Sequence, residues 1–293
     1  MKLFPFSFLF TVVSTTALMT VTSASANTLN VGPAYYPTRF YTQVDQGLKD
    51  GALKNELFKI LSSAHVPGAQ GHDTLVESCD GQRGCYRYSP MSYKQARSFV
   101  LGYLDLIEDH GHYALKDVYC EALYTDKDFP DGEGPHPGAP PAHTVFNVEH
   151  TWPQSRFSSK FSKNLQKPDL HILYGVSQKA NSSRQNVEFA DVQTEQHEVC
   201  PSVRRGWVRG NTTDVFFEPP DSHKGNVARA IFYFSVRYKM PVSPTEEASL
   251  RRWHKLDPVD AHERSRHEEI FKAQKDRNPF IDHPELVDLI SDF

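Results

Sequence analysis

The four cysteines constrain the fold of this chain more than any other feature of its sequence. Cys79, Cys85, Cys120 and Cys200 all lie downstream of an N-terminal segment that is typical of exported proteins. An even number of cysteines in an exported chain indicates disulfides, and four cysteines allow three pairings. Because the first two are separated by a short loop with two glycines, Cys79–Cys85 is the simplest local pair, which leaves Cys120 with Cys200. A zinc site is a weaker alternative, since no cysteines are spaced as C-x-x-C.

The first 26 residues are expected to form a secretory signal peptide. Lys2 supplies a positive charge, residues 3–21 are apolar or small and uncharged, and Ala24-Ser25-Ala26 fits a cleavage site. An uncleaved membrane anchor is the alternative, which the hydroxyl residues at 14–16 and the cleavage site disfavour. No later segment holds 18 consecutive apolar residues. We therefore expect residues 27–293 to be a secreted protein, extracellular or periplasmic, that makes no membrane contact.

The pattern of apolar residues predicts a mainly helical chain. The chain has 293 residues, of which 39% are hydrophobic and 23% are charged, an ordinary composition for a globular protein. Helical spacing or capping residues mark the segments 48–64, 92–106, 225–238, 245–254, 258–275 and 283–291. Strands are expected at 145–150 and from 117, and residues 169–174 are expected to begin a helix or a turn. Residues 27–45 and the Pro- and Gly-rich stretch 129–141 are expected to be irregular. The sequence thus predicts a single α+β domain over residues 27–293.

Residues 147–155 carry the first candidate chemistry. Glu149 offers a hard oxygen ligand that suits Mg²⁺, and His150 titrates near neutrality and could deprotonate a water molecule. Neighbours on a strand point to opposite faces, so a local turn would be needed to bring both side chains into one site. By itself this dipeptide is too common to indicate a function.

A second block follows at residues 169–186. It contains Asp169-Leu170-His171 and then Ala180-Asn181-Ser182-Ser183-Arg184-Gln185-Asn186. Asn181 offers a neutral oxygen ligand, and Arg184 could hold a phosphate through two hydrogen bonds. Taken singly, each of these residues is more typical of a turn.

The two blocks together resemble the endonuclease I family, periplasmic and extracellular nucleases with a ββα-metal, or His-Me finger, site. The resemblance rests on N-x-E-H-x-x-P-x-S followed by D-L-H and A-N-S-x-R-x-N, and it extends to residues 116–120, 217–230, 257–260 and 277–285. It implies that Glu149 and Asn181 bind a metal ion, Mg²⁺ with Mn²⁺ or Ca²⁺ as alternatives. It also implies that His150 is the general base, and that a monomer cuts DNA, or RNA as well, to leave 5′-phosphate ends.

Two departures from the family pattern stand out. Ile172 occupies a position where many relatives carry Asn. The arginine that contacts the scissile phosphate in some relatives falls between the two blocks, where Arg156 is the sole arginine, so either Arg156 or Arg184 is a candidate for this phosphate-binding role.

Two other functions remain open from the sequence: a nucleic-acid-binding protein that keeps the fold without catalysis, and a secreted hydrolase for another substrate. The net charge of −4 argues mildly against a nucleic-acid partner. Basic residues nevertheless cluster at 204–209 and 251–252, where a solvated surface is an equally good interpretation. Neither His197-Glu198 nor His267-Glu268 completes H-E-x-x-H, and no G-x-S-x-G or phosphate-binding loop is present.

Overall fold

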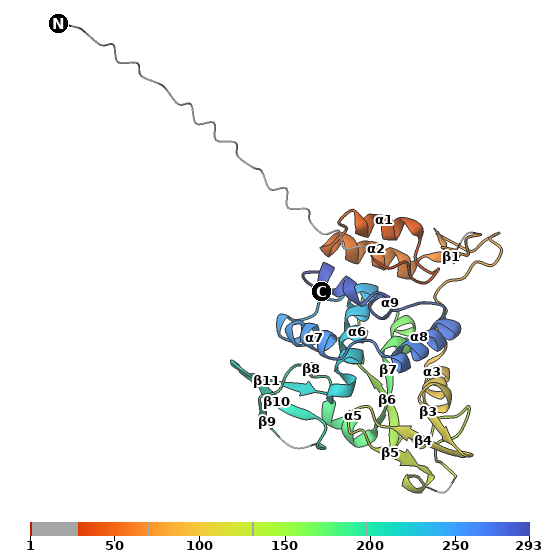
Figure 1. Ribbon diagram of the computed structural model, residues 1–293. Coiled ribbons are helices and arrows are strands. Elements are labelled where there is room, and N and C mark those ends of the chain that lie inside the picture. Colours follow the sequence, from red (N-terminus) through yellow and green to blue (C-terminus); the bar gives the residue numbers. More distant parts are fainter. Residues whose placement is uncertain (2–28, 70, 131, 197–198) are drawn as a thin grey trace.

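A computed structural model describes Met1 and residues 29–69, 71–130, 132–196 and 199–293 (Figure 1). The predicted signal peptide, Met1 apart, lies outside the described residues. Among the helices of the described ranges, none is both long and apolar enough to span a bilayer.

Helices make up the body of the fold. The longer ones are α2 (Asp50–Ser62), α6 (Asp221–Tyr238), α7 (Pro244–Leu256) and α8 (Ala261–Gln274). The shorter ones are α1 (Thr38–Asp45), α3 (Tyr93–Phe99), α4 (Lys163–Gln166), α5 (Gln178–Arg184) and α9 (Pro279–Asp282). A π-helical turn, Val100–Leu104, extends α3, and a 3₁₀ helix, Pro284–Leu289, precedes the C-terminus.

Helix α6 is the centre of the hydrophobic core. Nearly all of its residues are buried, and it packs against α2, α7 and α9. Trp152 and Phe157, from the segment after β6, both stack on Phe234 of α6. Arg229 would be costly to bury alone, but its Nε and Nη2 donate to the Glu263 carboxylate of α8 at 2.7 and 2.6 Å, and its Nη1 donates to the Asp257 carbonyl at 2.8 Å. The core thus seats the segment that follows β6 directly on α6.

The strands of the described residues form four small sheets. Two hairpin-like units are β1 (Ala64–Val66) with β2 (Thr74–Val76), and the antiparallel meander of β3 (Leu106–Asp109), β4 (His112–Lys116) and β5 (Leu123–Thr125). A third sheet has the order β8 (Glu188–Phe189), β11 (Asn211–Glu218), β10 (Arg204–Val208), β9 (Thr194–Glu195). The fourth pairs β6 (Phe146–His150) antiparallel with β7 (Leu173–Ser177). In Figure 1 the β3–β5 and β8–β11 sheets lie on either side of the β6–β7–α5 unit.

The predicted α+β class is confirmed, and so are the strand at 145–150 and the main helices. Ser92 caps α3 with a capping box that includes Gln95. Two local predictions were wrong. Residues 27–45 contain α1, which forms because Phe40, Tyr41 and Val44 share a buried face. The other correction concerns residues 117–120, whereas the helix or turn expected at 169–174 is confirmed by a 3₁₀ helix at Leu170–Ile172.

Residues 117–120 form a turn after β4 and do not begin a strand, because the Asp117 side chain accepts hydrogen bonds from backbone N–H groups two and three residues ahead. Residues 169–174 form a short 3₁₀ turn that leads into β7. That strand is buried along its whole length, so it lacks the alternation that marks a half-exposed strand.

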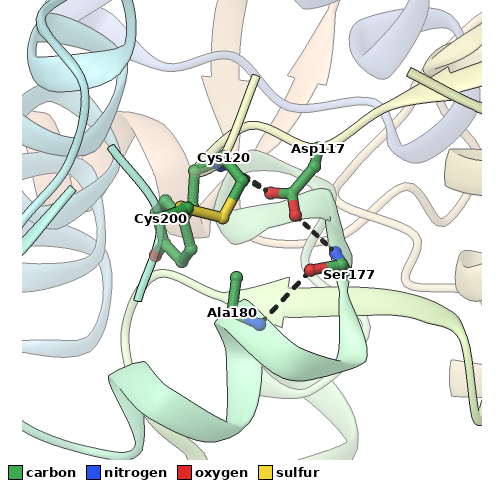
Figure 2. Close-up of a disulfide and its surroundings, with 6 residues drawn as sticks. Asp117, Cys120, Ser177, Ala180 and Cys200 are labelled. Atoms are coloured by element: carbon green, nitrogen blue, oxygen red, sulfur yellow. Dashed lines mark hydrogen bonds between the residues drawn. A yellow bond between two sulfur atoms is a disulfide. The ribbon is translucent and has the colours of Figure 1, made fainter. Parts of the chain in front are cut away.

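Two disulfides join Cys79 to Cys85 and Cys120 to Cys200, the pairing favoured from the sequence. The first closes a loop of six residues, whereas the second links positions 80 apart. Figure 2 shows the second disulfide beside Asp117, Ser177 and Ala180, close to where β7 ends and α5 begins. This long-range disulfide therefore ties the turn after β4 to the segment that leads into β10.

Candidate active site

Strands β6 and β7 and helix α5 form a compact ββα unit that gathers the predicted site residues. Glu149 pairs with Tyr174 and His150 with Leu173 in the antiparallel register. Helix α5 follows β7 at once, because the Ser177 hydroxyl accepts the backbone N–H of Ala180 as an N-cap. A pocket of about 280 Å³ opens at this unit and is lined by Tyr93, Asn147, Val148, Glu149, His150, Pro153, Gln154, Ser155, Asn181, Arg184, Gln185 and Asn186. We call it the ββα pocket.

Glu149 and His150 both line this pocket although they are neighbours on one strand. β6 ends at His150, and the chain bends at Thr151. The His150 side chain therefore does not have to point to the face opposite Glu149, as it would within a regular strand.

The Glu149 carboxylate is buried and held on one side. Its side chain is 3% exposed, and its Oε1 lies 3.0 Å from the Tyr119 hydroxyl and 3.1 Å from Nη1 of Arg184. Burial raises the pKa of Glu149, and the Arg184 guanidinium opposes that rise. Because both donors reach Oε1, Oε2 is the oxygen that a cation in the pocket could take.

Asn181 is oriented in a similar way. Its amide nitrogen donates to the carbonyl of Val148 at 3.2 Å, so its oxygen is the atom left for a ligand. Among the described residues, no group of three or more His, Cys, Asp or Glu side chains is placed to hold a metal ion. Two protein oxygens completed by water fit Mg²⁺, which usually keeps several of its waters.

His150 is held so that one ring nitrogen is left for chemistry. Its Nε2 lies 2.9 Å from the carbonyl oxygen of Lys167. A carbonyl only accepts, so Nε2 carries the proton and Nδ1 is the basic nitrogen. The Gln154 amide nitrogen lies 3.3 Å from Nδ1. Burial lowers the pKa of His150 to about 4, which keeps the ring neutral and able to accept a proton at pH 7.

Comparison with known proteins identifies the family of this chain. The sequence model described as Endonuclease I matches residues 51–285, well over half of the chain. The chain belongs to the endonuclease I family.

The curated relatives match a shorter part of this chain than the family model does. An extracellular ribonuclease of Bacillus subtilis (strain 168) is 36% identical over 164 residues, which cover 50% of this chain and 54% of that protein. An extracellular ribonuclease of Bacillus amyloliquefaciens is 33% identical over 165 residues, 50% of this chain and 53% of that protein. An extracellular deoxyribonuclease of Aeromonas hydrophila is 28% identical over 122 residues, 41% and 50% of the two chains. The chain therefore spans about half the length of the curated relatives it matches.

The two arginines considered for the endonuclease I phosphate contact differ in their surroundings. Arg184 lines the pocket but is only 1% exposed, and it donates to the carbonyls of Thr151 at 2.8 Å and His150 at 3.3 Å. Arg156 does not line the pocket, because its Nη2 is paired with Glu188 and Glu246, each at 3.2 Å. Arg184 is thus the arginine that the structure brings to the site.

Ile172, the departure from the family pattern, is fully buried in the core and does not line the pocket. Its carbonyl oxygen accepts the backbone N–H of Thr151 at 2.9 Å, which extends the pairing of β6 and β7 by one bond beyond the strand end. A backbone interaction of this kind does not depend on the side chain, so Ile172 leaves the geometry of the pocket in place.

Sequence reasoning overlooked several residues of the site. Tyr119 contacts Glu149, and Gln154 contacts His150. The Tyr93 ring packs near the His150 ring, with 5.5 Å between the ring centroids. Tyr119 and Gln154 lie inside the stretches that carried the family resemblance, so their position was visible although their contacts were not. Tyr93 had no such signal beyond following the N-cap Ser92.

Three segments that supply part of the pocket wall are free of acidic residues. Residues 91–104, 150–168 and 170–187 contain neither Asp nor Glu, although Asp105, Glu149, Asp169 and Glu188 border them. Their exposed basic residues are Lys94, Lys160, Lys163 and Lys179. These segments are therefore basic although the chain as a whole has a net charge of −4.

Proposed function

We propose that this chain is a secreted, metal-dependent, non-specific endonuclease that hydrolyses phosphodiester bonds of DNA and of RNA and leaves 5′-phosphate ends. The observation that carries the proposal is the His150 ring, whose Nε2 is bonded to the Lys167 carbonyl while Nδ1 shares a pocket with Glu149 and Asn181. Membership of the endonuclease I family supports the reaction class. The relatives named as ribonucleases and deoxyribonucleases support both nucleic acids as substrates.

His150 acts as the general base. Nδ1 takes a proton from a water molecule, and the resulting positive charge on the ring is stabilised by the Nε2–H bond to Lys167. The Gln154 amide lies beside Nδ1, so its side chain has to move away before that water molecule can contact Nδ1. Because the ring is neutral at physiological pH, no prior deprotonation is required.

Glu149 and Asn181 hold a divalent cation, Mg²⁺ with Mn²⁺ or Ca²⁺ as alternatives. When bound, such a cation neutralises charge on the scissile phosphate and on the leaving 3′-oxygen. Tyr119 and Arg184 keep the Glu149 carboxylate oriented by occupying Oε1. Asn181 is kept in place by its bond to Val148.

Substrate binding rests on phosphates more than on bases. The basic residues on the acid-free segments can follow a nucleic-acid backbone, which carries no sequence information and so gives a non-specific enzyme. For the contact to the scissile phosphate we favour Arg184 over Arg156, since only Arg184 lines the pocket. We also propose that the protein acts as a monomer after export, in the periplasm or the medium, where its two disulfides persist.

The decisive experiment is plasmid nicking with and without EDTA, run on the wild type and on Glu149→Ala and Asn181→Ala. We expect cleavage that EDTA abolishes, and variants that bind Mg²⁺ more weakly in calorimetry and recover part of their activity at higher metal concentration. Asn186→Ala is a matched control, because this asparagine lines the same pocket but bonds to Ser155. Plasmid binding without any cleavage would favour the alternative, a binding protein that keeps the fold but not the catalysis. Unchanged Mg²⁺ affinity in both ligand variants would refute the metal assignment.

A further inference from the structure

One buried carboxylate, that of Asp117, stands behind both proposed metal ligands. Asp117 is 0% exposed, and within the described ranges no Lys, Arg or His forms an ion pair with it. Instead it accepts three backbone N–H groups. Oδ1 accepts from Tyr119 at 2.8 Å and from Cys120 at 3.1 Å, and Oδ2 accepts from Ser177 at 3.1 Å. Figure 2 shows the carboxylate between the turn that holds Cys120 and the start of α5 at Ser177.

The Oδ1 side of Asp117 leads to Glu149. Its two hydrogen bonds fix the turn after β4, and this turn carries Tyr119. The Tyr119 ring is fully buried and packs against Phe217, with 4.8 Å between ring centroids. Its hydroxyl then donates to Oε1 of Glu149 at 3.0 Å. The position of the turn therefore sets the orientation of the first metal ligand.

The Oδ2 side leads to Asn181. Ser177 is the N-cap of α5, and its hydroxyl accepts the backbone N–H of Ala180 at 3.2 Å, a pair of contacts visible in Figure 2. Asn181 is the next residue of the helix. The Asp117 bond to the N-cap therefore sets where the first turn of α5, and with it the second metal ligand, stands relative to β6.

We infer that Asp117 is a positioning residue of the metal site, which aligns Glu149 and Asn181 with each other through these two branches. This inference rests on the proposed function, because it concerns the geometry of the proposed metal site. A carboxylate is required at this position, since it must accept N–H groups with both of its oxygens at once. An asparagine of the same shape has one accepting oxygen, and its NH₂ group would face a backbone donor on one of the two branches.

The alternative is that Asp117 only stabilises the fold, and the affinity of the free protein for a metal ion separates the two. Mg²⁺ alone is titrated by calorimetry into the full secreted chain and its variants, with thermal unfolding measured in parallel. We expect Asp117→Asn to weaken Mg²⁺ binding by about tenfold, the lower end of the range for residues that orient metal ligands. Tyr119→Phe and Ser177→Ala, which each interrupt one branch, should weaken it less.

Asp257→Asn is the matched control. Its Oδ2 also accepts a backbone N–H, that of Gly225 at 2.7 Å, but it does not line the ββα pocket. It should lower the unfolding temperature and leave Mg²⁺ affinity unchanged. Wild-type Mg²⁺ affinity in Asp117→Asn would overturn the inference. If Asp117→Asn does not fold, wild-type Mg²⁺ affinity in both Tyr119→Phe and Ser177→Ala would overturn it. Absence of Mg²⁺ binding by the wild type would instead refute the proposed function, and this inference with it.

Discussion

Two buried polar clusters of this molecule both contain at least one carboxylate, a side-chain amide and a tyrosine. They differ in whether these groups are used up by hydrogen bonds within the protein. One is the ββα pocket. The other, which we call the Asp169 network, consists of Asp169, Tyr233, Gln274 and Asp276. Gln274 donates its amide hydrogens to Oδ1 of Asp169 at 3.0 Å and to Oδ1 of Asp276 at 2.8 Å. The Tyr233 hydroxyl lies 2.8 and 2.7 Å from their Oδ2 atoms.

Counting hydrogens shows why the network is closed. Tyr233 has one hydroxyl hydrogen and two close carboxylate oxygens, so a second proton must lie between these groups. Burial raises the pKa of both Asp169 and Asp276, the latter to about 7, and Arg237 opposes both rises, so the two carboxyl groups share that proton. In the ββα pocket, by contrast, Glu149, Asn181 and His150 line a cavity. Saturated buried polar groups hold a structure, whereas oriented groups with capacity left can bind and react.

The two clusters meet at residues 165–169. Asp169 anchors this segment in the network, and the Leu165 carbonyl accepts from Tyr88 at 2.8 Å and from Tyr238 at 2.9 Å. Lys167 lies between Leu165 and Asp169 in the chain. Its carbonyl oxygen accepts a hydrogen bond from His150, the proposed general base. The closed cluster therefore fixes the backbone on which the open one depends.

The largest effect is expected from removal of the long-range disulfide on the pocket side. Replacing Cys120 and Cys200 by serine should lower the free energy of unfolding by about 4 kcal/mol in the chain-entropy model, and Cys79 and Cys85 by about 2 kcal/mol, because the loop is shorter. Activity should fall only in the first variant, since Cys120 belongs to the turn that carries Tyr119. Urea denaturation measures both losses. Equal losses, or four free thiols in the active secreted protein, would contradict this.

The next effect separates two histidines with similar surroundings. His150 and His254 both bond through Nε2 to a backbone carbonyl, at 2.9 and 3.0 Å, and burial lowers the pKa of each to about 4. His150→Ala should reduce kcat by at least about a hundredfold, the usual contribution of a general base. His254→Ala should cost stability and leave kcat near the wild-type value. Initial rates of plasmid nicking decide between them, and comparable losses in both would argue against His150 as the base.

The sequence allowed more of the open cluster to be predicted than of the closed one. Glu149, His150 and Asn181 were predicted because their two short motifs, taken together, resemble the endonuclease I family. The second strand of the site, β7, was missed because Leu173–Ser177 is buried on both faces and has no alternation. Asp276 had no local signal either, since its partner Asp169 is more than 100 positions away and the two come together where the turn at 170–172 packs against α6 and α8.

Arg184 illustrates a different limit of the sequence. Its residue type suggested that it holds a phosphate. The direction of a long side chain is set by tertiary contacts, however, and here those contacts turn the guanidinium inward to Glu149 and to the carbonyls of Thr151 and His150.

The pH dependence of stability should distinguish the two buried histidines from Asp276 by sign. At His150 and His254 the unfolded chain binds more protons than the folded one between about pH 6.5 and 4, so stability falls as the pH is lowered. At Asp276 the folded pKa, about 7, exceeds the ordinary value of 3.8, so stability is present at low pH and is lost as the pH rises toward 7. Asp276→Asn removes this opposing contribution. The loss of stability between pH 7 and 4.5 should therefore become steeper, by on the order of 2 kcal/mol. Urea titrations at the two pH values test this, and an unchanged or shallower slope would contradict the shared proton.

The smallest effect makes the sharpest comparison, because the same atom is removed once from each cluster. Tyr233→Phe deletes the hydroxyl between Asp169 and Asp276, but Gln274 continues to bridge the pair. We expect a loss of about 1 kcal/mol in the free energy of unfolding, the net value of one buried hydrogen bond, and no change in Mg²⁺ affinity. Tyr119→Phe deletes the hydroxyl that orients Glu149, so it should weaken Mg²⁺ binding at a similar or smaller cost in stability. Calorimetry and urea denaturation on both variants give a two-by-two comparison. If Tyr233→Phe weakened metal binding as much as Tyr119→Phe, the closed cluster would control the ligands directly, and its separation from the open one would be wrong.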